Sequence, residues 1–266
     1  MPLNSSRIDW PVRFAATSYV VRATVAGGTE DLPFPASGLL TLNRNYWLSG
    51  DGQADADGGV GGVGDLITML ATCLTGHTAP ATFTGTLGAT FRTFLQASTG
   101  SFSILWPHAN TTFDQAVFGF TDANTPSDIS TAGTLLPQGI WRPKRATAVD
   151  SRELQPIVGG TARAISGLQR TSALALPRRE RELEWRHIVQ AQTLQEYELA
   201  DEPFGSFEEA WLNSIRLGRP FRYYADETLR LSTSYQLYRA RELEQPMKRN
   251  ASYPIFWDIG LKCVVA

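Results

Sequence analysis

The chain has 266 residues, of which 42% are hydrophobic and 19% charged, and its formal net charge is −2. This length is sufficient for two domains of ordinary size, each with a buried core. No basic segment is interleaved with aromatic residues, which argues against nucleic-acid binding. No run reaches the roughly 20 apolar residues of a membrane helix, and the opening residues do not resemble a secretory signal. We therefore expect synthesis in the cytoplasm without membrane insertion.

The composition favours β-structure. Glycine and proline are frequent, with 23 and 15 residues, whereas the charged fraction is modest. Strands joined by turns fit this composition better than a helical bundle, whose exposed faces need more Glu and Lys. Residues 1–140 contain five arginines, no lysine and ten acids, a net charge of −5, and the remainder has a net charge of +3. An acidic half joined to a basic half would suit head-to-tail contacts between copies.

The first strands are predicted near the N-terminus. Alternating apolar residues indicate a strand within residues 13–25, which Gly27 and Gly28 would end. A segment with proline and glycine then leads to two further apolar runs, at residues 39–42 and 46–48. We expect two strands there.

One helix is predicted in the first half. A loop rich in glycine and aspartate, residues 50–64, precedes Asp65, whose side chain can cap a helix that runs to Leu74 and stops at Gly76. Three short strands follow, at residues 83–87, 91–97 and 102–106. Strands, a helix and further strands would form one compact module.

The middle of the chain shows no clear periodicity. Turn residues are scattered over residues 107–178, so we expect a linker there. Within it, residues 162–168 and 172–176 are candidate strands. The two cysteines, Cys73 and Cys263, are expected to be buried free thiols, because a cytosolic compartment keeps thiols reduced.

The second half has a clearer pattern. Residues 182–189 alternate, which predicts a strand with Leu183, Trp185, His187 and Val189 on its buried face. The sequence Ser206-Phe207-Glu208-Glu209 has the form of a capping box and predicts a helix of about three turns, ended by Gly218. Strands are expected at residues 221–224, 235–238 and 257–265. The predicted fold is α+β and mainly β, with two sheet-based modules, residues 1–140 and 141–266, each holding one short helix.

No catalytic, cofactor-binding or metal-binding residues are predicted. The glycine pattern at residues 59–64 matches a dinucleotide motif, but neither a preceding apolar strand nor the acid about 20 residues later is present. The cluster of Asp51, Asp55 and Asp57 suggests calcium, yet Leu66 stands where the bidentate Glu of the loop is required. The histidines and cysteines never fall at the spacing of zinc ligands. His187 is expected to be a packed residue, and the chain is not expected to be an enzyme.

Two segments resemble virion structural proteins of bacteriophages. Residues 39–122, with Tyr46-Trp47-Leu48-Ser49-Gly50, Phe102-Ser103-Ile104-Leu105-Trp106 and Phe118-Gly119-Phe120, resemble a small module of such proteins. Residues 207–265 are similar to segments of tail and baseplate proteins, including distal tail proteins, in which a helix precedes G-x-P-F-R-Y-Y-x-D. Here that motif reads Gly218-Arg219-Pro220-Phe221-Arg222-Tyr223-Tyr224-Ala225-Asp226. Together these segments cover a little more than half of the chain.

The resemblance implies a structural subunit of a phage tail or baseplate, located in the virion. Such a subunit would form a homo-oligomeric ring with copies of itself and contact other tail or baseplate proteins, and no catalytic residues carry over. The alternative is a carbohydrate- or receptor-binding module at the tail tip, for which Trp141, Tyr223, Tyr224 and Tyr238 would have to be exposed. A third candidate, a cell-wall hydrolase, would need a poised acid or a metal that the sequence does not provide.

Overall fold

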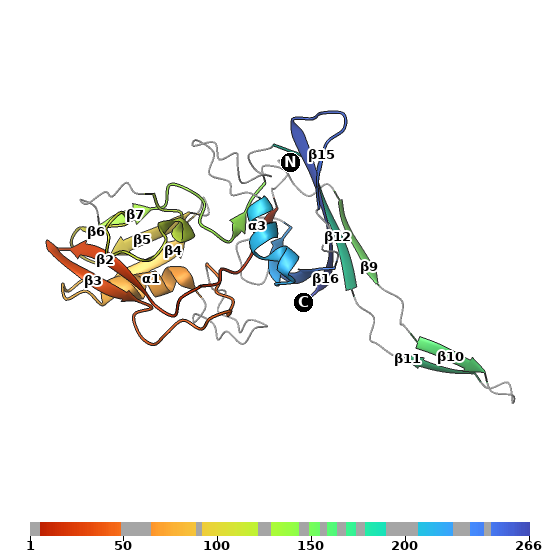
Figure 1. Ribbon diagram of the computed structural model, residues 1–266, viewed down its shortest axis with the longest axis horizontal. Helices are drawn as coiled ribbons and strands as arrows, with labels where there is room; N and C mark the ends of the chain where they lie inside the picture. Colours follow the sequence, from red (N-terminus) through yellow and green to blue (C-terminus); the bar gives the residue numbers. More distant parts are fainter. Residues whose placement is uncertain are drawn as a thin grey trace.

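The computed structural model describes most of the chain, and its described part is mainly β. It contains two short α-helices, so the predicted fold class is confirmed. The strands form one sheet of eight strands, two sheets of three strands and a separate two-stranded hairpin. The two three-stranded sheets lie together with helix α1, and the large sheet lies beside them (Figure 1). The described residues are 6–48, 65–88, 92–121, 129–143, 149–154, 159–163, 169–173, 179–189, 207–225, 235–241 and 246–266.

The two small sheets and α1 form what we call the N-terminal module. In one sheet β2 lies between β3 and β6, and in the other β5 lies between β4 and β7. All these neighbours are antiparallel. The predicted strands at residues 83–87, 91–97 and 102–106 are confirmed as β4, β5 and β6. The elements are β2 (Tyr19–Val25), β3 (Gly28–Phe34), α1 (Leu66–Thr75), β4 (Phe83–Leu87), β5 (Thr93–Ala97), β6 (Phe102–Ile104) and β7 (Ser130–Ala132).

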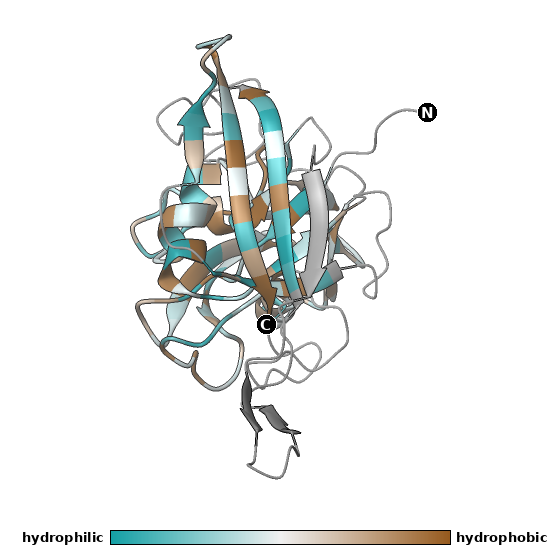
Figure 2. Cartoon of the chain, turned by 90° about the vertical axis from the view of Figure 1, so that its right-hand side faces the viewer, coloured by the Kyte–Doolittle hydropathy of each residue, from teal (hydrophilic) through white to brown (hydrophobic). Residues whose placement is uncertain are grey.

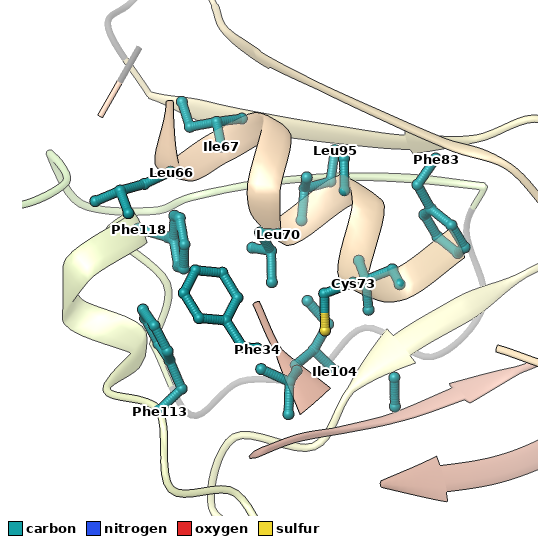
Figure 3. Packing of buried hydrophobic residues seen from close by; sticks show 14 of the residues in the cluster. Phe34, Leu66, Ile67, Leu70, Cys73, Phe83, Leu95, Ile104, Phe113 and Phe118 are labelled. Atoms are coloured by element: carbon teal, nitrogen blue, oxygen red, sulfur yellow. The ribbon is translucent and has the colours of Figure 1, made fainter. Parts of the chain in front are cut away.

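Helix α1 confirms the prediction made from its caps. The carboxylate of Asp65 accepts hydrogen bonds from the backbone N–H groups of Ile67, at 3.1 Å, and Thr68, at 3.2 Å. The helix ends at Gly76. Its apolar face packs towards three phenylalanines from other elements (Figure 3), which are Phe34, Phe113 and Phe118. The helix thus closes the core over the two small sheets.

The expected strands at residues 39–42 and 46–48 are wrong. β2 pairs with β3 and β6, and Leu39 and Leu42 are exposed. Tyr46 and Trp47 make only isolated bridges. Only Leu32 and Phe34 are buried in β3, so its apolar alternation is too short to stand out after the polar residues that precede Leu32.

The large sheet belongs mainly to the second half of the chain. Its strand order is β8-β1-β13-β14-β16-β12-β9, and β15 pairs with β16. Alternating polar and apolar residues are visible along its long strands (Figure 2). Predicted strands at residues 221–224, 235–238 and 257–265 are confirmed as β13, β14 and β16. The strands are β1 (Arg7–Asp9), β8 (Ile140–Trp141), β9 (Val149–Leu154), β12 (Arg179–Val189), β13 (Phe221–Tyr224), β14 (Tyr235–Ala240), β15 (Met247–Arg249) and β16 (Phe256–Val265).

The linker expected at residues 107–178 is wrong, because this region contributes structure to three sheets. It supplies β7 to the N-terminal module and β8 and β9 to the large sheet. These strands are short, and each is stabilised by pairing with a strand distant in sequence. Their own residues therefore show no periodicity from which a strand could be predicted. The region also contains a 3-10 helix and a hairpin, namely η1 (Gln115–Phe118), β10 (Gly159–Arg163) and β11 (Gln169–Ala173).

The predicted second helix is present, and it packs on the large sheet. Helix α3 (Phe207–Asn213) is followed by a 3-10 turn, η3 (Ile215–Leu217), and Gly218 ends it with a φ of 70°. Phe207, Trp211 and Ile215, which recur at helical spacing, are buried. Ser206, the predicted cap, lies outside the described residues.

The first strand of the chain lies inside the large sheet. β1 pairs with β8 on one side and with β13 on the other, so that Ile8 lies opposite Tyr223. The buried residues form two clusters, and Ile8 and Trp10 belong to the cluster of the large sheet. The other cluster runs from Phe14 to Ile140. The predicted module boundary at residue 140 stays a prediction.

A buried group of charges joins the large sheet to the N-terminal module. The guanidinium of Arg7 contacts the carboxylate of Asp9 at 2.7 Å, and Arg222 lies opposite Asp9 on β13. Arg222 also places its guanidinium 3.9 Å from the ring centre of Trp47, a residue of the chain segment that leads to α1. Burial raises the pKa of Asp9, and the two guanidinium groups oppose that rise. Through Arg222, both β1 and the N-terminal module are thus connected to β13.

Candidate assembly surface

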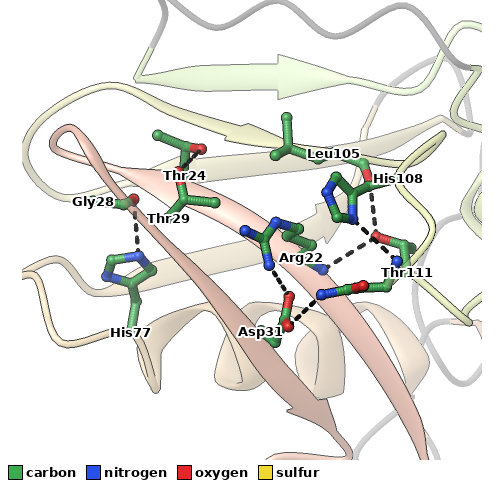
Figure 4. Close-up of polar contacts among 10 residues, drawn as sticks. Arg22, Thr24, Gly28, Thr29, Asp31, His77, Leu105, His108 and Thr111 are labelled. Atoms are coloured by element: carbon green, nitrogen blue, oxygen red, sulfur yellow. Dashed lines mark hydrogen bonds and ion pairs between the residues drawn. The ribbon is translucent and has the colours of Figure 1, made fainter.

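The described residues contain no candidate metal site. No group of three His, Cys, Asp or Glu side chains lies together in the described part of the chain. The imidazole of His77 is fixed by the carbonyl of Gly28 at 3.2 Å and by the backbone N–H of Ala79 at 3.0 Å. His108 lies in a turn near the other end of β2 (Figure 4). The glycine pattern at residues 59–64 and the aspartates at 51, 55 and 57 lie outside the described residues.

The cysteines are buried free thiols, as predicted. Cys73 lies on the core face of α1 and Cys263 on the core face of β16. Burial raises the pKa of each thiol to about 12. Neither thiol is therefore activated as a nucleophile near neutral pH.

The N-terminal module carries a group of connected polar side chains on its surface. Arg22 on β2 contacts Asp31 on β3 at 2.6 Å, and the side-chain amide of Asn110 donates to the same carboxylate at 2.7 Å (Figure 4). These hydrogen bonds lower the pKa of Asp31. Because each group already has a partner within the module, the arrangement joins β2, β3 and the turn at residues 107–111.

Four aromatic residues that were candidates for a binding surface are core residues. Trp141 is fully buried and packs edge-on against Trp185, with ring centres 5.2 Å apart. Tyr223, Tyr224 and Tyr238 are also buried. The hydroxyl of Tyr238 accepts a hydrogen bond from Arg181 at 2.7 Å. The motif at residues 218–226 therefore contributes packing to the large sheet, as far as its described residues show.

An apolar surface does occur at the turn between β15 and β16. Tyr253 and Ile255 are exposed by 58% and 69%, and Pro254 between them is also exposed. The hairpin projects beyond the rest of the large sheet (Figure 2). We call residues 248–257 the tip.

The tip is held in one conformation by hydrogen bonds. The side-chain oxygen of Asn250 accepts from the N–H groups of Ser252, at 3.0 Å, and Tyr253, at 2.9 Å. Its side-chain nitrogen donates to Asp258 at 2.8 Å. The N–H of Phe256 donates to the carbonyl of Tyr253 at 2.9 Å, which closes the turn. The backbone of Tyr253 is thus fixed by hydrogen bonds on both sides of the turn.

A β-bulge in β12 places a histidine against the tip. The pairing register between β12 and β16 shifts between Trp185 and Ile188, and His187 has a φ of 57°. The prediction that His187 shares a face with Trp185 is therefore wrong, because the bulge buries Ile188 in its place. The N–H of His187 donates to Asp258 at 3.0 Å. The imidazole lies 5.9 Å from the rings of Tyr253 and Phe256, measured between ring centres.

A second projecting feature is the hairpin of β10 and β11, which we call the arm. Its two strands pair from Gly159 with Ala173 to Arg163 with Gln169. They form a sheet of their own, and the arm extends away from the large sheet beyond β9 and β12 (Figure 1). A two-stranded hairpin is marginally stable in water by itself. The arm is therefore a candidate for contact with another molecule.

Sequence reasoning missed the tip for a physical reason. Tyr253 lies within residues 207–265, the segment that resembles tail proteins, and this tyrosine is exposed while Trp257 is half-buried. The turn-forming residues Asn250, Ser252 and Pro254 could have indicated an exposed turn. The β-bulge, which sets the histidine beside that turn, has no signal in the alternating pattern of residues 182–189.

None of the helices in the described part of the chain is long and apolar enough to cross a membrane. Comparison with protein-family models gives no match to this chain, and no curated protein sequence matches it significantly.

Proposed function

We propose that this chain is a structural subunit of a phage tail or baseplate, which assembles with copies of itself into a ring. The observation that carries the proposal is the arm, a hairpin that pairs only with itself among the described strands. Ordering two strands costs conformational entropy that a hairpin alone hardly offsets. A neighbouring subunit that packs against the arm would supply the missing burial.

The charges of the arm support a neighbour of the same kind. β10 and β11 contain Arg163 and Arg170 and no acidic residue. Residues 1–140 have a net charge of −5. The basic arm of one copy would therefore be attracted to the acidic half of the next. A contact between two different surfaces is heterologous, and repetition of such a contact closes a ring when the rotation permits.

The aromatic motifs that resemble tail proteins are compatible with a structural role. Phe221, Arg222, Tyr223 and Tyr224 are all buried in β13, where they hold the centre of the large sheet. The alternative, a glycan-binding module, depended on the exposure of Tyr223, Tyr224, Tyr238 and Trp141. Their burial removes the observation that favoured it.

The proposal can be tested by removing the arm from the full chain. In one variant residues 159–173 are replaced by a short Gly-Ser turn, and in a second Arg163 and Arg170 are changed to Glu. A matched control changes Arg216 and Arg239, two exposed arginines elsewhere in the second half, to Glu. Size-exclusion chromatography with light scattering and negative-stain micrographs report assembly, and circular dichroism reports folding.

We expect rings from the parent and from the control, and monomers with unchanged melting from the two arm variants. Assembly of the arm variants equal to that of the parent would contradict the role of the arm. A parent protein that stays monomeric at every concentration would contradict self-assembly itself.

A further inference from the structure

Four arginines gather where the N-terminal module meets the large sheet. They come from three separate parts of the chain, since Arg13 follows β1, Arg216 and Arg219 follow α3, and Arg239 lies on β14. Helix α3 lies between the N-terminal module and the long strands of the large sheet (Figure 1). We call these four residues the arginine cluster.

Contacts at the end of α3 bring three of these side chains together. The guanidinium groups of Arg216 and Arg219 donate to two consecutive carbonyls in the last turn of α3, at 3.1 Å and 2.7 Å. Arg239 places its guanidinium 3.4 Å from the carbonyl of Gly218, the residue directly before Arg219. The three positive charges therefore contact the same short segment, residues 212–218.

Arg13 joins this group from the side of the N-terminal module. Its Nε donates to the side-chain oxygen of Asn45 at 2.7 Å, which connects Arg13 to the segment that leads to α1. β1 and β13 are antiparallel, with Asp9 opposite Arg222, so the residues after β1 pass those before β13. Burial and the positive charge of Arg13 lower the pKa of Arg219, so these two guanidinium groups are close enough to repel each other.

The arginine cluster has no carboxylate partner among the described residues. The ion pairs found in that part of the chain involve other arginines, and each guanidinium of the cluster is held by an uncharged oxygen instead. An arginine remains protonated near neutral pH, so it cannot relieve repulsion by losing a proton. An anion bound between the guanidinium groups would remove that repulsion.

The negative end of α3 explains only part of the cluster. Positive charges are favourable at the C-terminus of a helix, which accounts for Arg216 and Arg219. Arg13 is held by Asn45, and Arg239 by the turn that follows η3, so the helix end does not account for these two. The cluster thus holds more positive charge than the helix requires.

We propose that the arginine cluster binds a compact phosphate anion. A guanidinium presents a planar set of N–H groups that matches two phosphate oxygens at once. Each arginine is already oriented by a hydrogen bond to the protein, so it loses little conformational entropy on binding. Several fixed positive charges at one place suit an anion of two or more charges better than a single carboxylate. A phosphate between Arg13 and Arg219 would also connect the N-terminal module to the large sheet.

The site can be tested with pyrophosphate and the full chain. Isothermal titration calorimetry at an ionic strength kept constant with NaCl should show binding, and saturating pyrophosphate should raise the melting temperature by about 2 °C or more. Arg13→Gln with Arg219→Gln should lose both signals, because each charge-assisted hydrogen bond removed weakens binding about tenfold or more. Lys248→Gln with Arg249→Gln is the matched control. It removes two exposed positive charges from β15 and should bind pyrophosphate like the parent.

A second variant covers the case in which the first one does not fold. Arg216→Gln with Arg239→Gln changes only exposed side chains of the cluster, so circular dichroism should show an unchanged fold. Its Kd for pyrophosphate should be about tenfold higher than that of the parent, or more. An unchanged Kd would overturn the proposal.

The remaining outcomes decide the nature of the ligand. A parent protein that responds to pyrophosphate no more than to NaCl would overturn the proposal, and equal binding of citrate would overturn the assignment to phosphate. Binding of a short DNA duplex through the cluster, without a response to pyrophosphate, would replace the compact anion by nucleic acid. None of these measurements requires assembly. A parent that stays monomeric and binds pyrophosphate would contradict the proposed function and leave this inference intact.

Discussion

The packing of α1 on β4 can be tested at a single glycine. A Cβ atom added at Gly85 would lie 2.6 Å from Cγ2 of Ile67 and 2.8 Å from the carbonyl oxygen of Ile67. Because ordinary contacts begin near 3.4 Å, the helix backbone would have to withdraw by roughly 0.6 Å, and no rotamer change of Ile67 can move its carbonyl. Overpacking of this kind costs about 1–3 kcal/mol. Alanine recovers about 0.5–1 kcal/mol by restricting the unfolded chain.

We therefore expect Gly85→Ala to lower the free energy of unfolding by about 1–2 kcal/mol. Gly260→Ala is the matched control, because Gly260 also lies in a strand, β16, and a Cβ there would meet nothing within 4 Å. Its stability should equal or slightly exceed that of the parent. Urea titration followed by circular dichroism compares the three proteins. Equal midpoints for the two variants would refute the close approach of α1 to β4.

Two further predictions concern the buried residues of the second helix and the thiols. Trp211→Ala should lower the free energy of unfolding by about 3–5 kcal/mol, because it leaves a cavity between α3 and the large sheet. Leu217→Ala, at an exposed position, should change the free energy of unfolding by less than about 0.5 kcal/mol. Denaturant melts with the opposite order would mean that the buried face of the helix is misassigned. Cys73 and Cys263 should resist iodoacetamide at pH 8 in the native protein and react after addition of urea, because burial raises their pKa values to about 12. As these folded-state pKa values lie above the ordinary value of 9.0, ionisation favours the unfolded chain, and stability should decrease as the pH rises from 9 towards 12. Fast labelling of the native protein, or stability that is unchanged across that range, would contradict the burial of the two thiols.

Elements with a strong local signal could be predicted from the sequence. The cap at Asp65, the stop at Gly76 and the alternation of Ile259, Leu261 and Cys263 each depend on near neighbours, so a single segment contains the information. Fold class follows from the same local patterns. The buried side of α3 was also predictable, because Phe207 and Trp211 are one helical turn apart.

Elements fixed by distant partners could not be predicted. β1 and β8 are too short to show periodicity, and each exists because another strand lies beside it. The face of Tyr238 could not be assigned either, since its burial depends on Arg181 and the neighbouring strands. For the candidate surface the difficulty is similar. A sequence pattern does not distinguish the exposed Tyr253 from the buried Tyr223. The exposure of each tyrosine depends on whether residues distant in sequence cover its ring.

The position of β1 has a consequence for the order of folding during synthesis. Ile8 leaves the ribosome before its partner Tyr223, which follows only after more than two hundred further residues. The N-terminal module, whose contacts fall between residues 14 and 140, can form meanwhile. The charged side chains of Arg7 and Asp9 therefore stay hydrated until β13 has been synthesised. The large sheet is therefore expected to form after the N-terminal module, and the segment that includes Trp10 then connects the two.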